Sequence, residues 1–207
     1  MGTTERKQHE ATHRRQSILA AARQVFRHKG YAGATVAEIA QTAELATGTL
    51  YLYFAGKDAL YVELLSEGYE LLERRLRDQT AKKDDPRSVA DGLIDVFFDF
   101  AREYPEYFDI IFFVLQRESA RPYQDNFPAE QIERLNGWRS SCLEAAAKVF
   151  EQVEFVRPED RQSLVETMWS MLAGVVFYFG NTEAFDVMAA RAKELLLRAV
   201  FGHSAAT

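Results

Sequence analysis

The chain has 207 residues, of which 47% are hydrophobic and 27% charged, and its formal net charge is -6. This is the composition of an ordinary soluble protein with one large or two small domains. A single cysteine, Cys142, excludes an intrachain disulfide and a thiolate zinc cluster; it fills core space or, alternatively, acts as a redox switch. No apolar run approaches the roughly 18 residues of a membrane span, and residues 1–16 lack the apolar stretch of a secretory signal, so a cytoplasmic protein is expected.

Charge is unevenly distributed along the chain. Residues 1–57 carry eight Lys or Arg and four Glu, whereas the rest carries 17 basic and 27 acidic residues. A basic end favours contact with phosphates, and an acidic remainder limits non-specific adhesion to DNA. Residues 1–13 are predicted to form a flexible basic tail. The basic residues in and beside it either contact a minor groove or belong to a disordered terminus; they are Arg6, Lys7, Arg14 and Arg15.

Three short helices are predicted over residues 14–60. The first has apolar residues at helical spacing and ends at Lys29-Gly30, where glycine suits a C-terminal cap. The second runs from about residue 36 to 43, behind a capping box of Thr35 and Glu38. The second and third helices, joined by a tight turn, are typical of a DNA-binding helix-turn-helix.

The third of these helices is expected to start at Thr47 as its cap and to turn Leu50 and Phe54 inward. Its outward hydroxyls and tyrosine tips suit phosphates, Gly48 permits close approach of the backbone, and Leu52 suits a thymine methyl. The alternative is an ordinary three-helix surface. The predicted DNA-binding residues are Thr35, Thr47, Gly48, Thr49, Tyr51, Leu52, Tyr53 and Lys57.

Residues 61–207 are predicted to form a larger helical domain for ligand binding and dimerisation. A long helix begins near Lys57, and another follows Pro86 and ends at Tyr104-Pro105. The segment from Tyr107 to Leu115 is apolar nearly all round, as in a helix that crosses a domain interior. Further helices are expected over about 129–152, 158–180 and 183–201. No strand pattern appears, so the predicted fold class is all-α.

One stretch of the chain closely resembles the DNA-binding domain of TetR-family transcriptional regulators. The resemblance covers roughly residues 14–62. The matching residues are Phe26, Lys29-Gly30-Tyr31, Gly33-Ala34-Thr35, Ile39-Ala40, Ala43, Leu45, Gly48-Thr49-Leu50-Tyr51, Tyr53-Phe54, Lys57 and Leu60. It implies a homodimeric regulator, usually a repressor, that releases a palindromic operator when a small ligand enters the C-terminal domain.

This chain departs from the family pattern in the turn of the helix-turn-helix. Family members commonly carry glycine where this chain has Glu44. A left-handed backbone at this residue would cost about 1 kcal/mol, and it would place a negative charge near DNA. Base contacts are therefore not assigned to Glu44 or Ala46.

The predicted second domain is rich in aromatic residues, most of which belong to its core. Together they also favour an apolar pocket for a hydrophobic or aromatic small-molecule effector, such as an acyl chain or a planar drug. The predicted pocket residues are Phe97, Phe100, Tyr107, Phe108, Phe112, Trp138, Trp169, Phe177 and Tyr178.

The last two predicted helices carry apolar residues on more than one side. One side serves the core, and the other favours a four-helix interface between two copies of the chain. The predicted dimer residues are Met168, Leu172, Val176, Leu195 and Ala199.

An acidic row, consisting of Asp91, Asp95, Asp99 and Glu103, recurs every four residues and either attracts a cationic ligand or forms a solvated helix face. All four histidines lie outside the central helices, so no catalytic residues, metal site or cofactor are predicted. The chain is therefore interpreted as a ligand-released repressor that binds double-stranded DNA. The alternatives are an activator, a protein-binding scaffold, and a helical carrier or scavenger of hydrophobic molecules.

Overall fold

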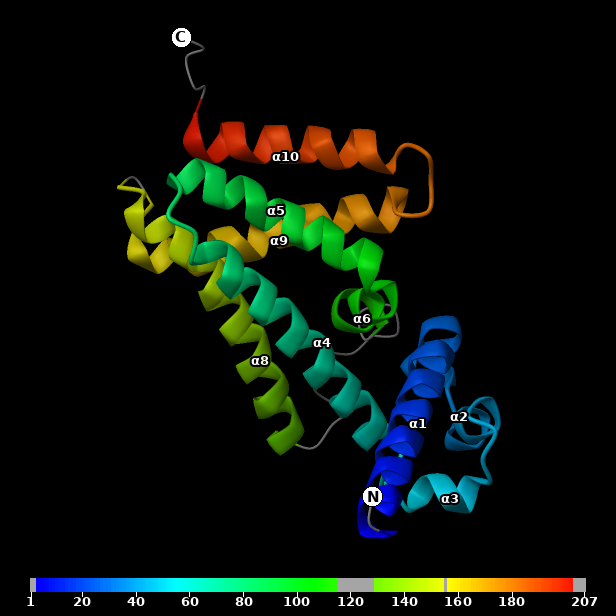
Figure 1. The fold of residues 1–207 in the computed structure, drawn as a ribbon. Helices are drawn as coiled ribbons and strands as arrows, with labels where there is room; N and C mark the ends of the chain where they lie inside the picture. Colours follow the sequence, from blue (N-terminus) through cyan, green and yellow to red (C-terminus); the bar gives the residue numbers. More distant parts are fainter. Residues whose placement is uncertain (1–2, 115–128, 155, 203–207) are drawn as a thin grey trace. The chain divides into compact units, whose positions relative to one another are not determined.

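The computed structural model describes residues 3–114, 129–154 and 156–202, and every regular element in these ranges is a helix, which confirms the all-α class (Figure 1). The described residues form two compact units. The first unit contains residues 3–68, 106–114 and 129–135, and the second contains residues 69–105, 136–154 and 156–202. The division falls after Gly68, within helix α4 (Lys57–Thr80), whereas the sequence predicts it near residue 60.

In the first unit, α1 (Thr3–Gly33) starts earlier than expected, because residues 3–13 are helical where a flexible tail is predicted. Residues 5–16 contain neither Gly nor Pro, and Arg6 and Glu10 form an i,i+4 ion pair of 3.7 Å, which together favour a helix. The helix is interrupted at Gly30, whose φ of 71° and ψ of -179° are open to glycine alone. The predicted stop at this residue is thus confirmed.

Aromatic rings join α1 to the start of α4. The ring of Tyr61 packs edge-on against Phe26 and Tyr31, with centroid distances of 5.2 and 5.0 Å. The buried Tyr61 hydroxyl donates a hydrogen bond to the backbone oxygen of Ile110 at 3.0 Å. A segment distant in sequence is therefore part of the first unit.

That segment contains α6 (Pro105–Asp109) and the π-helix η1 (Ile110–Val114), of which residues 106–114 belong to the first unit. The sequence predicts one helix over residues 107–115 inside the second domain, and this prediction is wrong in its placement. An all-apolar segment shows only that it is enclosed and does not show by which helices. Residue 115 lies outside the described residues.

The second unit contains the later part of α4, helix α5, most of α8 and the helices that follow α8. Helices α5, α9 and α10 pack against one another and lie side by side in Figure 1. Asp85 caps α5 by accepting hydrogen bonds from the backbone N–H groups of Arg87 and Ser88. The elements of this unit are α5 (Pro86–Glu103), most of α8 (Ala129–Ala147), η3 (Lys148–Gln152), η4 (Pro158–Asp160), α9 (Arg161–Phe179) and α10 (Phe185–Phe201).

Cys142 of α8 is fully buried, and burial raises the pKa of its thiol to about 12. A thiol with so high a pKa is protonated at neutral pH and reacts poorly with oxidants, which favours core filling over a redox switch. Within the described residues, no helix is both long enough and apolar enough to cross a membrane.

Candidate functional sites

Helix α2 (Val36–Thr42) begins with the predicted capping box. The Thr35 hydroxyl accepts a hydrogen bond from the Glu38 backbone N–H at 3.2 Å, and the Glu38 carboxylate accepts from the Thr35 N–H at 3.1 Å. Lys29 also pairs with Glu38, and hydrogen bonds from Lys29 and Thr35 lower the pKa of the Glu38 carboxyl. Both polar groups that Thr35 would offer to a phosphate are therefore engaged by Glu38 in this structure.

The turn after α2 is closed by a Schellman motif. The Leu45 N–H donates to the Ala40 carbonyl at 2.8 Å, and the Glu44 N–H donates to the Gln41 carbonyl at 3.0 Å. Glu44 has a φ of 56° and is the one non-glycine residue with positive φ among the described residues. The turn thus keeps the left-handed conformation that suits glycine, at a position where this chain has a side chain.

Helix α3 (Thr47–Tyr51) presents the predicted face to solvent. Leu50 and Phe54 are buried, whereas Leu52 is 83% exposed and Tyr51 is 53% exposed. Thr49 and Tyr53 are half-buried, and Thr47 and Gly48 are exposed. A Cβ added to Gly48 would meet nothing within 4 Å, so protein packing does not require this glycine.

The start of α3 differs from the prediction. Ala46, not Thr47, occupies the cap position, and no side chain caps the helix. Ala46 has an extended backbone and Thr47 is already helical, because the Schellman turn ends one residue before Ala46. The Thr47 hydroxyl is consequently not used for capping.

Lys57 is tied into the fold of the first unit. Its ammonium donates to the Tyr31 carbonyl at 2.8 Å and lies 4.4 Å from the centroid of the Tyr31 ring. The Tyr31 hydroxyl in turn donates to Asp58. Lys57 therefore anchors the start of α4, and its contact with a phosphate stays a prediction.

Three predicted pocket residues, Tyr107, Phe108 and Phe112, lie in the first unit and not in the second, which contains the other predicted pocket residues. The Tyr107 hydroxyl donates to Glu67 of α4 at 2.6 Å, and the guanidinium of Arg23 lies 4.8 Å from the Tyr107 ring centroid. Burial and the hydrogen bond to Glu67 raise the pKa of Tyr107. Tyr107 therefore joins α6 to α1 and α4, whereas Phe108 packs on the ring of Phe112 in η1.

The second unit contains a small apolar cavity of about 20 Å³ between α5, α9 and the end of α8 with η3. Of the predicted pocket residues, Trp169 lines it, and Phe97 packs against Trp169 with ring centroids 6.0 Å apart. Phe100 is buried, and Trp138 stacks on Tyr69 away from the cavity lining. The cavity is lined by Ala90, Leu93, Ile94, Ala146, Val149, Phe150, Val165, Met168, Trp169 and Leu172.

The burial of the predicted pocket and dimer residues of α9 differs from the expectation. Met168 and Leu172, predicted at a dimer interface, are buried and line the cavity. Phe177 and Tyr178, predicted in the pocket, are 52% and 73% exposed. Because α9 is apolar on several sides, helical periodicity alone does not identify its inner face.

The exposed apolar side chains of α9 and α10 form a second candidate surface. Leu195, predicted at the interface, is 61% exposed, and Ala199 is exposed too, whereas Val176 is half-buried. We call this surface the α9–α10 face; its large exposed apolar residues are Met171, Phe177, Tyr178, Val187 and Leu195.

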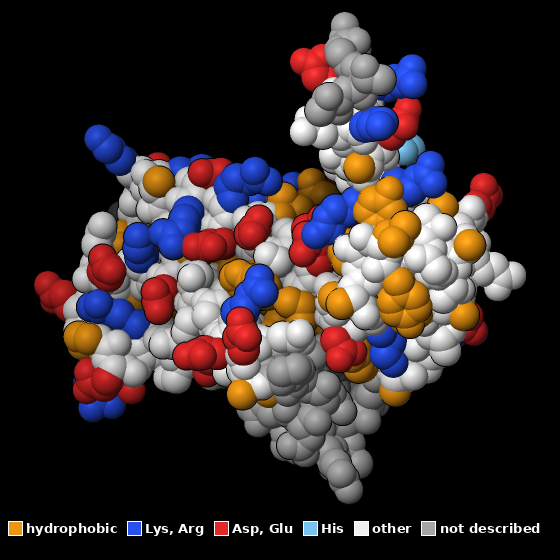
Figure 2. All heavy atoms as spheres, turned by 90° about the horizontal axis from the view of Figure 1, so that it is seen from below, with side chains coloured by type: hydrophobic (Ala, Val, Ile, Leu, Met, Phe, Trp, Pro, Cys, Tyr) orange, Lys and Arg blue, Asp and Glu red, His pale blue; other side chains and the backbone are white. Residues whose placement is uncertain are grey.

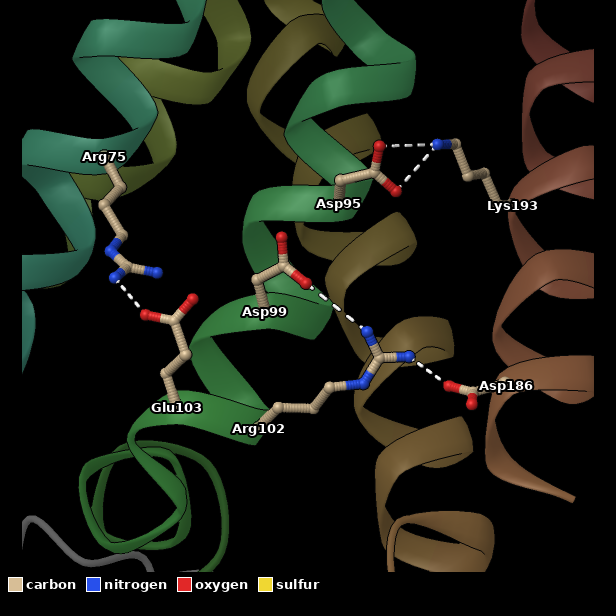
Figure 3. Close-up of polar contacts among 7 residues, drawn as sticks. All are labelled: Arg75, Asp95, Asp99, Arg102, Glu103, Asp186 and Lys193. Atoms are coloured by element: carbon tan, nitrogen blue, oxygen red, sulfur yellow. Dashed lines mark hydrogen bonds and ion pairs between the residues drawn. The ribbon is translucent and has the colours of Figure 1, made fainter. Parts of the chain in front are cut away.

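The acidic row of α5 is paired with basic residues and is not an open cation site (Figure 3). Lys193 of α10 lies 2.7 Å from both Asp91 and Asp95. Although burial alone would lower the pKa of Lys193, hydrogen bonds to these carboxylates raise it overall. Farther along α5, Arg102 bridges Asp99 and Asp186, and Arg75 of α4 pairs with Glu103. The described residues also contain no group of three or more His, Cys, Asp or Glu that could hold a metal ion.

Comparison with known proteins agrees with this arrangement. Residues 18–64 match the family model described as bacterial regulatory proteins, tetR family. The chain is 31% identical over 99 residues to the HTH-type transcriptional activator FasR of Mycolicibacterium smegmatis, a match spanning 48% of this chain and 45% of FasR. It is 29% identical over 105 residues to the HTH-type transcriptional repressor NicS of Pseudomonas putida, spanning 49% of this chain and 48% of NicS. The chain thus matches about half the length of these relatives.

Solved structures resemble the fold over most of the chain. A tetR-family regulatory protein from Rhodococcus RHA1 superposes with a TM-score of 0.75 at 20% identity, covering 90% of this chain and 96% of that protein. The regulator FadR from Bacillus subtilis, solved in complex with stearoyl-CoA, gives a TM-score of 0.70 at 18% identity, covering 91% and 98% of the two chains. These similarities extend the fold assignment to the second unit.

Replacing Glu44, which has a left-handed backbone, tests whether this residue strains the turn. We expect Glu44→Gly to raise the free energy of unfolding by about 1 kcal/mol, because glycine adopts this φ without a Cβ clash. Urea denaturation followed by circular dichroism measures the change. Glu144→Gly is the control: Glu144 is exposed within right-handed α8, so its replacement should lower stability by about 1 kcal/mol. A loss of stability in Glu44→Gly would contradict the strain assignment.

Proposed function

We propose that this chain, which belongs to the TetR family of transcriptional regulators, is a homodimeric repressor that releases a palindromic operator when it binds an apolar ligand. The observation that carries the proposal is the exposed face of α3, whose side chains have no structural task in the first unit. Tyr51 and Leu52 are large, and Leu52 is almost fully in solvent. A regulator that inserts α3 into the major groove would cover these side chains with DNA.

Within this face, the residues divide by chemistry. Thr47 and Thr49 have hydroxyls and Leu52 has methyl groups, which suit base edges and the thymine methyl. Tyr51 and Tyr53 suit phosphate oxygens, and Gly48 leaves room for the sugar-phosphate backbone. Thr35 caps α2 and Lys57 binds the Tyr31 carbonyl. We therefore expect these two residues to contribute less to phosphate binding than Tyr51 and Tyr53. A carrier protein with a vestigial helix-turn-helix would not need these groups to surround the buried Leu50. Their arrangement therefore favours a DNA-binding regulator over a carrier.

The α9–α10 face supports dimerisation. A monomer that exposed these apolar side chains would leave them in contact with water, and an isologous pairing of the face on two copies would bury them. A dimer also gives two copies of α3, and a palindromic site presents its two half-sites about 34 Å apart in successive major grooves.

The cavity beside Trp169 supports an apolar effector. Its lining residues are Ala, Val, Leu, Ile, Met, Phe and Trp, with no charged side chain among them. FadR of B. subtilis, similar in fold, was solved with stearoyl-CoA, which favours a fatty acyl group as the occupant here. Since about 20 Å³ holds little more than one water molecule, an acyl chain has to displace α5, α9 or η3 to enter.

Ligand release would follow from differential affinity. A ligand that binds better to a form of the chain unable to hold DNA shifts the population toward that form, and DNA binding weakens by the same factor. Helix α4 is the covalent route for such a change, because it begins beside the helix-turn-helix and continues into the second unit. Activation in place of repression is the second candidate, since FasR is named an activator and NicS a repressor.

The DNA-binding step is tested with duplexes selected from a random-sequence library by the full chain. We expect an inverted repeat bound at nanomolar concentration with a steep salt dependence. Tyr51→Phe should weaken binding to every sequence by about tenfold, because it removes a phosphate hydrogen bond. Leu52→Ala should relax the preference at one base pair in each half-site. Fluorescence anisotropy at several salt concentrations measures both effects, and equally weak binding to every duplex would refute DNA recognition.

The dimer is tested by placing a charge on the α9–α10 face. Leu195→Glu should yield a monomer in analytical ultracentrifugation and weaken operator binding strongly, because a charge opposite its own copy is repelled and desolvated. Gln162→Glu, an exposed position at the start of α9 about half a turn around from Met171, is the control and should remain dimeric. A dimeric Leu195→Glu variant would show that the interface lies elsewhere.

The effector step is tested with stearoyl-CoA in a Trp138→Phe background, where Trp169 is the remaining tryptophan. We expect stearoyl-CoA to shift the Trp169 emission and to release DNA over the same concentration range. Ala146→Leu adds three carbon atoms to the cavity lining and should weaken both responses at least tenfold, whereas Ala81→Leu, at an exposed position, should not. Release of DNA without any change in Trp169 emission would place the effector outside this cavity.

A further inference from the structure

The first turns of α1 bury no side chain among the described residues of the first unit. Residues 5–14 are all exposed, and Ala11 is the single apolar residue between positions 5 and 16. Figure 2 shows this part of the helix projecting from the packed helices of its unit, with Lys, Arg and Glu side chains along it. We call residues 5–15 the α1 arm. A polar helix of this kind gains no stability from packing on an apolar core. Contact with an external partner is therefore a reason for this segment to be helical.

The α1 arm carries four basic residues, Arg6, Lys7, Arg14 and Arg15, against two acidic ones, Glu5 and Glu10. Arg6 is paired with Glu10, and Arg15 is paired with Glu63 at 2.8 Å. Lys7 and Arg14 form no ion pair with any described residue. They lie seven residues apart, which places them on the same face of the helix two turns from one another.

That face continues the buried face of α1. Lys7, Ala11, Arg14 and Ile18 follow helical spacing, and Ile18 is completely buried in the core of the first unit. The side of α1 that packs on the other helices therefore becomes basic and exposed toward its N-terminal end.

The C-terminal end of the α1 arm, at Arg15, lies close to the segment that follows α3. The guanidinium of Arg15 lies 4.4 Å from the ring centroid of Phe54, which is three residues beyond the end of α3 and two beyond its exposed cap residue Leu52. From Arg15 to Lys7 the helix spans about 12 Å at 1.5 Å per residue. Over this length B-DNA carries about seven phosphate charges.

We propose that the α1 arm is a second DNA-binding element, in which Lys7 and Arg14 contact phosphates beside the base pairs that α3 reads. The inference rests on the proposed DNA-binding function and extends its interface beyond the helix-turn-helix. DNA is the partner because the exposed face combines unpaired positive charge with continuity to α3. A protein groove or a membrane would require apolar anchors, and Ala11 is the sole apolar side chain available.

The test uses the full chain and the duplex selected from the random library. The double variant Lys7→Gln/Arg14→Gln should bind this duplex about tenfold more weakly at 150 mM salt. The slope of log K against log salt should be shallower by about 2 for each protomer, because each phosphate contact contributes about 0.9. Hydroxyl-radical footprinting should show that the wild-type chain protects backbone positions that the variant leaves open. Base preference should stay unchanged, since phosphate contacts carry no sequence information.

The matched control is Lys82→Gln/Lys83→Gln, which removes two exposed lysines from the second unit and should retain the wild-type slope and footprint. An unchanged slope and footprint in Lys7→Gln/Arg14→Gln, with circular dichroism showing an intact fold, would overturn the α1 arm contact alone. Failure of the wild-type chain to select any duplex would instead refute the proposed function together with the arm. The two failures are thus separated by the behaviour of the wild-type chain.

Discussion

The direction of the recognition helix depends on how the two ends of α2 are closed. Helices α2 and α3 have seven and five residues, far fewer than an isolated helix needs in water. The Thr35–Glu38 capping box satisfies orphan N–H groups at one end of α2, and the Schellman turn at Glu44 satisfies carbonyls at the other. Because Glu44 is strained in this turn, the chain retains a geometry that costs about 1 kcal/mol. The position of α3, which buries its own Leu50 and is followed by the buried Phe54, follows from that closure.

Contacts at the start of α4 determine which residues move together with the helix-turn-helix. Tyr31 receives Lys57 on its ring and carbonyl and donates to Asp58, so the end of α1 holds the start of α4. Tyr61 extends this attachment to Ile110. A conformational change in α6 or η1 would therefore act directly on the unit that contains α3. It would not have to be transmitted along α4.

Sequence periodicity identified inner and outer faces where one side of a helix is polar, and it failed where all sides are apolar. Leu50 and Phe54 were predictable because Thr47, Thr49 and Tyr51 around them are polar. On α9, apolar residues surround the helix, so the choice between Met168 and Tyr178 as the inner residue depends on helices distant in sequence. The same limit explains Tyr107, which contacts Arg23 of α1 and Glu67 of α4, both in the first unit and not in the second. The sequence marks Glu44 as unusual because family members commonly carry glycine there. The geometry of its turn, however, depends on backbone hydrogen bonds that side-chain patterns do not encode.

If the small cavity beside Trp169 takes the proposed effector, the free energy needed for switching sets a lower limit on the size of that ligand. Moving a two-state equilibrium from 1:99 to 99:1 requires about 5.5 kcal/mol of differential binding free energy. Burial of one methylene contributes about 0.8 kcal/mol, so about seven methylenes that fit only the open form would supply it. A small planar ring buries too little additional surface to open a cavity of about 20 Å³ and also shift the population. For the proposed ligand-released mechanism, these energies favour a long acyl chain over a compact aromatic molecule.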